Sequence, residues 1–202
     1  MATLAPNPTP ARPSVFNLPN QLTASRAVLS VVLFALIAWH EWVWCTVVFA
    51  GAAVTDWLDG YLARKQGLTS TLGRVLDPLV DKVLVCGAYI FLLPEMEAGL
   101  LPWMVTLVVA RELVITGLRS FMESRSATFG ADWLGKIKMV LQCAALFAIF
   151  IALYAVEEEW SGDARSFFAV TRDLLIYAML VATALSGLQY LWRAALLLKV
   201  EE

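Results

Sequence analysis

Four aspartates at helical spacing carry the clearest chemical signal in the sequence. Asp56 and Asp59 are three residues apart and Asp77 and Asp81 are four apart, so each pair lies on one face of a helix. A carboxylate in an apolar segment is costly unless it faces a polar cavity, a partner or a metal. Carboxylate oxygens suit Mg²⁺ or Mn²⁺, and two such ions about 3.5–4 Å apart would neutralise the charges and bind phosphate oxygens. The spacing therefore predicts a two-metal site that acts on a phosphate-bearing substrate.

Two alternative roles for the aspartates stay open from the residue types and spacing. Close carboxylates can share a proton, and ion pairs with Arg64 and Lys82 would be purely structural. The bases near the acids are too few to balance them, which favours the metal site. Gly60 and Ala63 share the face of the first aspartate pair and leave room for a ligand to approach the backbone, although small residues also serve helix packing.

A second cluster is basic. Arg111 lies in an apolar stretch, Arg119 follows eight residues later on the same helical face, and Lys136 and Lys138 open a later apolar segment. A buried arginine needs an anion, and its guanidinium binds phosphate through two hydrogen bonds. Because Glu112 is the neighbour of Arg111 in sequence, we expect the two side chains to form a poor ion pair. We expect Glu112 instead to order another basic group or to hold the helices together. The four bases predict a pocket for an acceptor that carries phosphate, such as inositol phosphate or glycerol 3-phosphate, although the lysines would also serve as interfacial anchors.

Composition indicates the elements that must position these groups. Of 202 residues, 60% are hydrophobic and 16% charged, with a mean hydropathy of +0.71, whereas soluble domains are about 45–50% apolar and about 25% charged. A soluble two-domain enzyme, a disordered protein and a nucleic-acid-binding protein are excluded, the last because the net charge is only −2. The pattern predicts an all-α polytopic membrane protein with six transmembrane helices. The expected spans are about 26–39, 42–62, 76–93, 101–121, 133–156 and 174–198.

The remaining segments suggest a single domain. Residues 1–14 contain four prolines and lack the apolar core of a signal peptide, so we expect a disordered N-terminal lead before one membrane domain over 15–202. Cys45, Cys86 and Cys143 stand singly in apolar stretches, which is typical of core residues rather than of disulfides or metal ligands.

The basic residues predict how the helices face the membrane. With a cytoplasmic N-terminus, eleven of the 15 lysines and arginines lie on the inner side, as membrane proteins favour. Arg165 and Arg172 would fall in an outer loop, Lys82 and Arg111 lie within spans, and the outer connections carry solvated acids. Both termini and the aspartates are therefore expected at the cytoplasmic side. The eleven are Arg12, Arg26, Arg64, Lys65, Arg74, Arg119, Arg125, Lys136, Lys138, Arg193 and Lys199.

Residues 56–81 fit the pattern DxxDGxxARx8GxxxDxxxD at every specified position. This pattern resembles the signature of the CDP-alcohol phosphatidyltransferases, integral membrane enzymes of about six helices. The resemblance implies that the four aspartates bind two divalent metal ions, that Gly60, Ala63 and Arg64 help to hold the CDP moiety, and that Asp81 is the general base. It also implies a possible homodimer.

Further segments look like the phosphatidylglycerophosphate synthase branch of that family. They are NLPNQLTASR at 17–26, LDPLVDK at 76–82, RELVITGLR at 111–119 and GKIK at 135–138, and the last span matches in hydrophobicity only. Val80 and Met139 depart from the branch, which affects the acceptor assignment and not the metal site.

The same resemblance implies a set of contacts to the CDP-lipid near the membrane interface, together with Arg26. Without the resemblance, Thr23 is a possible helix cap and Arg26 a membrane anchor. Ser70 and Thr71 would hydrogen-bond a phosphate, or they are ordinary polar loop residues. The implied N-terminal contacts are Pro19, Asn20, Gln21, Leu22 and Thr23.

The resemblance implies transfer of a phosphatidyl group from CDP-diacylglycerol to glycerol 3-phosphate, giving phosphatidylglycerophosphate and CMP, at the cytoplasmic side of a bacterial inner membrane. A cardiolipin synthase and an inositol-phosphate transferase are alternatives within the family. An intramembrane cation transporter or aspartyl protease would also use buried acids. A transporter should need polar groups at the midplane, and a protease pair would leave two aspartates unexplained. Metal-dependent release of CMP would separate the enzyme from both.

Overall fold

The structure is a computed structural model that describes residues 18–66, 71–124 and 133–200, with side chains described for 21, 24–55, 79–122 and 133–196. Over these residues the chain forms six α-helices and one short 3₁₀ helix, without a strand, which confirms the all-α prediction. The predicted lead over 1–14 lies outside the described residues. The helices are α1 (Leu18–Ala38), α2 (Trp42–Gln66), α3 (Thr71–Phe91), η1 (Met96–Ala98), α4 (Pro102–Ser124), α5 (Trp133–Glu157) and α6 (Gly162–Val200).

Residues with unusual backbone requirements lie where the helices end. His40 has a positive φ of 62° in the turn between α1 and α2, and Gly99 has a φ of 69° after η1, a region that glycine enters without steric cost. Pro102 is the first residue of α4, where the missing proline N–H removes no helical hydrogen bond. These breaks make the connections short, so successive helices reverse direction.

The prediction for the last helix was wrong at its start, because α6 begins at Gly162 and not near residue 174. Ser161 accepts a hydrogen bond from the backbone N–H of Ala164 at 3.3 Å, and Asp163 lies in the first turn, both of which favour a helix N-terminus. Arg165 and Arg172 therefore lie in α6 and not in an outer loop. Arg172 is buried and donates to the carbonyl oxygen of Glu97, which lies in η1, and to Asp173 at 2.9 Å.

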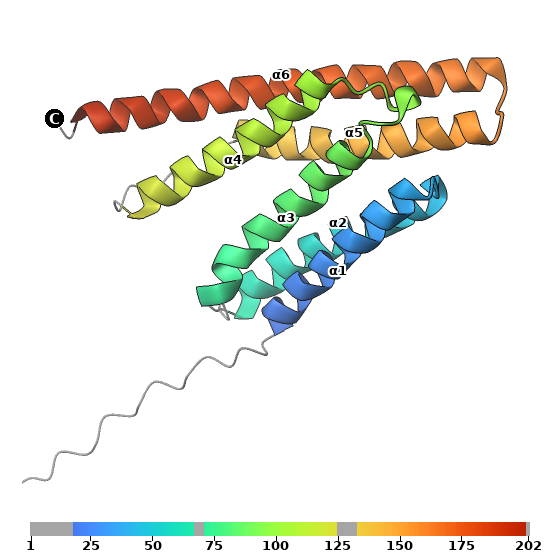
Figure 1. Cartoon of the computed structure of the whole chain (residues 1–202). Helices are drawn as coiled ribbons and strands as arrows, with labels where there is room; N and C mark the ends of the chain where they lie inside the picture. Colours follow the sequence, from blue (N-terminus) through green and yellow to red (C-terminus); the bar gives the residue numbers. More distant parts are fainter. Residues whose placement is uncertain (1–17, 67–70, 125–132, 201–202) are drawn as a thin grey trace, which may run out of the picture.

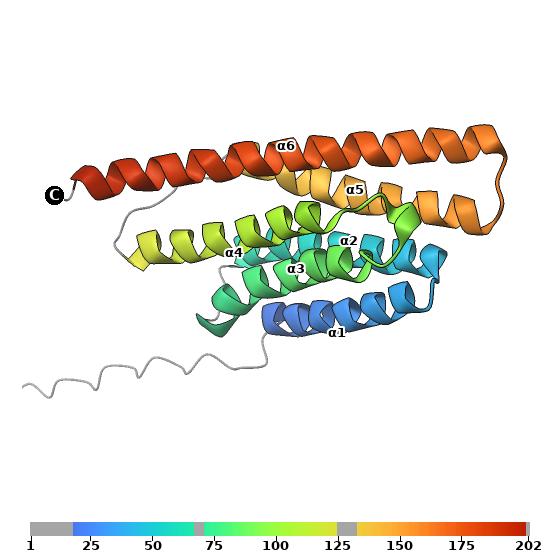
Figure 2. The same cartoon turned by 45° about the horizontal axis from the view of Figure 1, so that its top comes forward.

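The helices form two groups joined by α5 (Figure 1). Helix α1 packs against α2 and α3, whereas α6 packs along α5 and also contacts α4. Helix α5 contacts α2, α3 and η1 as well, so it links the two groups. Both views show α6 extending along the whole length of α5 and beyond it, and α1 on the opposite side of the molecule (Figures 1 and 2).

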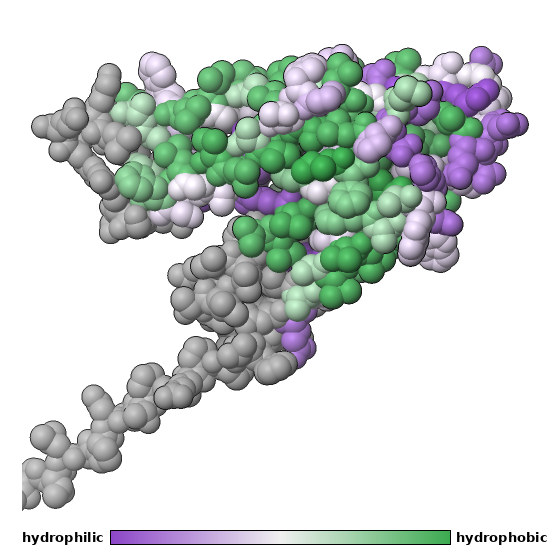
Figure 3. All heavy atoms as spheres, in the orientation of Figure 1, coloured by the Kyte–Doolittle hydropathy of each residue, from purple (hydrophilic) through white to green (hydrophobic). Residues whose placement is uncertain are grey.

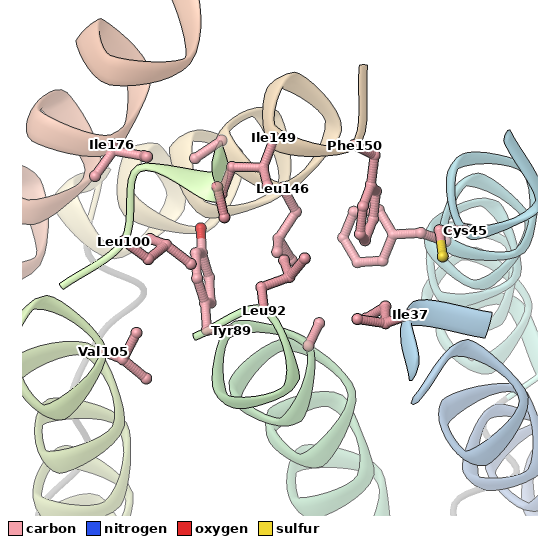
Figure 4. Close-up of a cluster of buried hydrophobic side chains, with 14 of the residues drawn as sticks. Ile37, Cys45, Tyr89, Leu92, Leu100, Val105, Leu146, Ile149, Phe150 and Ile176 are labelled. Atoms are coloured by element: carbon pink, nitrogen blue, oxygen red, sulfur yellow. The ribbon is translucent and has the colours of Figure 1, made fainter. Parts of the chain in front are cut away.

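The core lies where α2, α3 and α5 meet (Figure 4). Tyr89 of α3, Leu92 directly after α3 and Phe150 of α5 are fully buried there. Cys45 of α2 is buried with them, as the sequence predicted. The Tyr89 hydroxyl donates to the carbonyl oxygen of Gln142 on α5 at 3.0 Å. Cys143 is partly buried against this core and Cys86 is also only partly buried. The core thus holds the helices together at one level of the molecule, and the polar sites lie at another level along the same helices.

Two described helices, α5 and α6, are long and apolar enough to cross a membrane, and the apolar parts of α1 and α2 are shorter. A face of α6 exposes one large apolar side chain after another, which fits contact with lipid. Figure 3 shows hydrophobic residues over the middle of the visible face and hydrophilic ones at the end where α5 joins α6. These exposed side chains of α6 are Val170, Leu174, Tyr177, Val181, Leu185 and Leu188.

Close contact between α1 and α3 depends on Gly87. A Cβ at this position would overlap the ring of Phe34, which is stacked on Phe91 with centroids 4.9 Å apart. We expect Gly87→Ala to destabilise the protein by about 1–3 kcal/mol, because the Phe34 ring must move and lose part of its stacking on Phe91. Thermal unfolding in detergent would show this as a melting temperature lower by about 2–10 °C.

Gly51→Ala is the matched control for Gly87→Ala. A Cβ at Gly51 meets no described atom within 4 Å, and alanine is the better helix former by about 1 kcal/mol, so this variant should keep or slightly raise the melting temperature. Equal melting temperatures for the Gly87 variant and the wild type would show that α1 and α3 do not need this close contact.

Candidate active site

Asp81 is the one predicted metal ligand whose side chain is described, and it is paired with Arg26. The Arg26 guanidinium donates to Oδ1 of Asp81, joining α1 to α3. Arg26 is only 2% exposed, and Ser30 donates to its backbone carbonyl oxygen at 2.8 Å. The interpretation of Arg26 as a membrane anchor is therefore wrong, since its charge is directed inward and is balanced by a carboxylate.

The other aspartates lie on the same two helices as their spacing predicted, but their side chains fall outside the described part of the structure. Asp56 and Asp59 are in the C-terminal part of α2, and Asp77 is one turn before Asp81 in α3. Only residues 67–70 separate these helices, a shorter connection than the one between the expected spans 42–62 and 76–93. The end of α2 and the start of α3 are therefore at most about 18 Å apart. Figure 1 shows these ends side by side, next to the start of α1.

Most of the predicted contacts to the CDP-lipid lie outside the part of the structure whose side chains are described. Among them, Gln21 is described and is exposed on α1. Thr71 is the first residue of α3 and Ser70 precedes the described segment. The others whose side chains lie outside the described part are Pro19, Asn20, Leu22, Thr23, Gly60, Ala63 and Arg64.

The residues present fit a divalent cation by their donor chemistry. No group of three potential ligands occurs among the described side chains, a set that excludes three of the four predicted ligands. Asp81 is 31% exposed, so its carboxylate reaches the surface of the helix group. Carboxylate oxygens alone make a donor set that hard cations such as Mg²⁺ and Mn²⁺ prefer.

The basic cluster is centred on a buried carboxylate, Glu112 of α4. Lys138 of α5 and Arg111 of α4 both donate to Oε1 of Glu112, the latter at 3.2 Å. Glu112 and Lys138 are 7% and 5% exposed. The expectation that Glu112 orders another basic group is confirmed for Lys138. The expectation of a poor pair with Arg111 was wrong, because the long arginine side chain bends back to its neighbour.

Arg119 and Arg111 meet the same side chain of α6, as expected for two residues on one helical face. Their guanidinium carbons lie 5.6 and 5.9 Å from the centre of the Tyr190 ring. Arg119 also donates to the Tyr190 hydroxyl at 2.8 Å. Lys136 is exposed and is not part of this buried group, because residues two apart on a helix point in different directions.

Sequence reasoning missed the residues of α6 that complete the basic cluster. Ser186 accepts from Arg111 Nη2 at 3.1 Å, and Tyr190 contacts both arginines. The available signal was a serine and a tyrosine one turn apart in an otherwise apolar helix, where polar groups need partners.

The basic cluster lies beside the aspartate helix. Cys86 of α3 is within electrostatic range of Glu112, Lys138 and Lys82, and it follows Asp81 by five residues, a rise of about 7.5 Å. Figure 3 shows the surface hollowed between α3 and α4, with hydrophilic atoms at the inner end of the hollow. An acid suited to metal and an excess of positive charge suited to phosphate thus lie on helices that contact one another, an arrangement suited to phosphoryl-group transfer.

Known proteins with similar sequences agree with this chemistry. Residues 16–186 match the family described as CDP-alcohol phosphatidyltransferase. A protein of Bacillus subtilis named CDP-diacylglycerol–glycerol-3-phosphate 3-phosphatidyltransferase is 34% identical over 193 residues, covering 87% of this chain and 94% of its own. Proteins of the same name from Pectobacterium atrosepticum and Yersinia pestis are 37% and 32% identical, covering 66% and 87% of this chain and 76% and 93% of their own. The chain therefore belongs to the CDP-alcohol phosphatidyltransferase family of transferases, which generally depend on divalent metal ions.

Proposed function

We propose that this protein transfers the phosphatidyl group of CDP-diacylglycerol to glycerol 3-phosphate, giving phosphatidylglycerophosphate and CMP. The observation that carries the proposal is the basic cluster on α4 and α5, two helices that contact α3. Its cations are Lys138, which is buried, Arg111, which is partly buried, and Arg119, which is exposed. They stand against a single described carboxylate, Glu112, and such an excess of positive charge suits an acceptor that brings its own phosphate. The names of the relatives support the same acceptor.

The proposal includes the architecture around the site. All six helices cross the membrane as one domain over 15–202 after the N-terminal lead, with both termini and the active site at the cytoplasmic face of a bacterial inner membrane. The distribution of lysine and arginine supports this orientation. The proposal also includes a homodimer formed by two copies of the chain.

The proposed binding residues follow the family signature and the basic cluster. Two ions, Mg²⁺ or Mn²⁺, are held by Asp56, Asp59, Asp77 and Asp81. Arg111, Arg119 and Lys138 bind the acceptor phosphate, with Lys136 at the entrance. The CDP-lipid is held by Pro19, Asn20, Gln21, Leu22, Thr23, Gly60, Ala63, Arg64, Ser70 and Thr71.

In the proposed reaction the primary hydroxyl of glycerol 3-phosphate attacks the phosphorus that carries diacylglycerol, and the bond to the CMP oxygen breaks. Asp81 accepts the hydroxyl proton, which requires hydrogen-bond reach to the bound alcohol. Arg26 holds Oδ1 of Asp81 and so fixes the orientation of that carboxylate. The arginines hold the acceptor phosphate so that its hydroxyl end points toward Asp81. Bound metal ions supply neutralisation of the pyrophosphate charge.

An acceptor panel tests the proposal. Purified protein in detergent is given CDP-diacylglycerol with glycerol 3-phosphate, inositol phosphate, phosphatidylglycerol or no acceptor, and CMP release and the lipid product are measured. We expect CMP release only with glycerol 3-phosphate. Release with phosphatidylglycerol would identify a cardiolipin synthase, and release with inositol phosphate the other family alternative.

Metal removal is expected to abolish the activity. EDTA should lower CMP release by at least about 100-fold, since the metals neutralise charge that the protein's own cations are too few to balance. Added Mg²⁺ or Mn²⁺ should restore the rate, whereas Ca²⁺ should restore little of it because of its larger radius and looser geometry. Full activity after exhaustive chelation would contradict the aspartate metal site.

A further inference from the structure

One face of α6 lies against the two arginines of the basic cluster. The Ser186 hydroxyl accepts from Arg111 Nη2 at 3.1 Å, and a Cβ on Gly187 would lie 3.3 Å from Cγ of Arg111. Tyr190, one turn further on, contacts Arg111 and Arg119. The family match ends at residue 186, so Gly187 and Tyr190 lie beyond the segment that the family pattern covers.

Tyr190 makes two kinds of contact with the arginines. Its ring faces both guanidinium groups, with their carbons 5.6 and 5.9 Å from the ring centre, and its hydroxyl accepts from Arg119 Nη2 at 2.8 Å. The side chain is only 3% exposed. Cation–π attraction is stronger where water is excluded, so this buried ring can hold two like charges close together.

Ser186 is fixed as a hydrogen-bond acceptor for Arg111. Its side chain is fully buried, and its own hydroxyl donates to the carbonyl oxygen of Thr183 at 3.1 Å. This bond uses the serine proton and leaves a lone pair directed at the guanidinium. Ser186 and Glu112 therefore hold Arg111 by its two Nη atoms.

The Nε atom of Arg111 takes no part in these contacts. It is buried and has no hydrogen-bond partner among the described residues. Buried donors are nearly always paired, so this unsatisfied group marks Arg111 as a candidate functional side chain. Its two Nη atoms and the Tyr190 ring hold it in place.

We infer that Tyr190 and Ser186 are positioning residues for the acceptor, which hold Arg111 and Arg119 ready to bind its phosphate. This inference rests on the proposed function. A long arginine side chain loses much rotational freedom when it binds, and a side chain that is already ordered loses less. The two α6 residues therefore set the affinity for the acceptor and have no contact with the CDP-lipid in this role.

The test is a comparison of Michaelis constants for the two substrates. Tyr190→Leu removes the ring and the hydroxyl, and should raise KM for glycerol 3-phosphate about 30-fold. Tyr190→Phe keeps the ring and should raise it about fivefold, and Ser186→Ala about threefold. KM for CDP-diacylglycerol and kcat at saturating acceptor should stay within about twofold, because neither residue touches the reacting atoms.

Tyr177→Leu is the control, since Tyr177 lies on the same helix with 55% of its surface exposed, and both of its Michaelis constants should equal those of the wild type. Inorganic phosphate, tested as a competitor of glycerol 3-phosphate, should inhibit the Tyr190 variants more weakly in the same order. If Tyr190→Leu fails to fold, Tyr190→Phe and Ser186→Ala still test the inference.

The outcomes separate this inference from the proposed function. A wild type that does not use glycerol 3-phosphate contradicts the proposed function. A wild type that uses it, with variants whose KM for glycerol 3-phosphate is unchanged, overturns the inference alone. Equal changes in both Michaelis constants, or a loss confined to kcat, would also overturn it, because they indicate a general structural role.

Discussion

Asp81→Asn is expected to lower kcat by about 10³-fold, within the range of about 10²–10⁴-fold for loss of a general base. The asparagine amide cannot accept the proton of the attacking hydroxyl. The substitution also removes one anionic oxygen donor from the predicted metal site. Steady-state CMP release with saturating CDP-diacylglycerol and glycerol 3-phosphate measures the effect.

A second substitution separates the chemical role of Asp81 from its role as an ion-pair partner. Loss of the carboxylate removes the ion pair that joins the buried Arg26 to Asp81, so part of the loss of turnover would come from destabilisation. Arg26→Met in the Asp81→Asn background removes this buried charge and should restore the melting temperature without restoring turnover. Turnover near that of the wild type in Asp81→Asn, with Mn²⁺ binding intact, would show that Asp81 is not the base.

Glu112→Ala is expected to give the largest loss of stability, about 3–5 kcal/mol, because it leaves Lys138 and Arg111 buried without their shared carboxylate. For a protein of this size, such a loss lowers the melting temperature by about 10 °C or more. Activity should fall with it, since two proposed phosphate ligands lose their orientation. Thermal unfolding in detergent and CMP release would be measured together.

A double-mutant cycle tests whether the charge pair itself is responsible. Lys138→Met removes the cation of the same pair, and the Glu112→Ala, Lys138→Met protein should be more stable than Glu112→Ala alone. Turnover should not recover in the double variant, because Lys138 is a proposed ligand of the acceptor phosphate. Strictly additive losses of stability would mean that Glu112 acts through other contacts.

The sequence predicted the helices well because apolar length and breaks are local properties. It predicted that Asp81 would lie in an apolar helix and that a helix would begin near residue 101, and α4 begins at Pro102. The start of α6 was missed because Arg165 and Arg172 resemble loop residues. The carbonyl oxygen of Glu97 that receives Arg172 is 75 residues away in the sequence, and no local pattern shows it.

The same limit applies to the site. Spacing along α4 correctly placed Arg111 and Arg119 on one face, because both residues belong to one helix. Helical spacing misjudged the Arg111–Glu112 pair, since it follows Cβ directions and ignores the reach of a long side chain. Tyr190 could not be predicted as a partner, because the contact depends on how α6 packs against α4.

Arg172 and Tyr190 stand 18 residues apart on α6, which is five full turns of a helix, or about 27 Å. Their side chains therefore project from the same side of α6, which is one continuous helix. Arg172 is held by the backbone of η1 at one end, and Tyr190 contacts the two arginines of α4 at the other. The hydrogen bond of Arg172 therefore fixes how the whole of α6 is rotated about its own axis. A single residue gained or lost between them would turn one end by about 100° relative to the other, so the number of residues between these two side chains is itself a functional constraint.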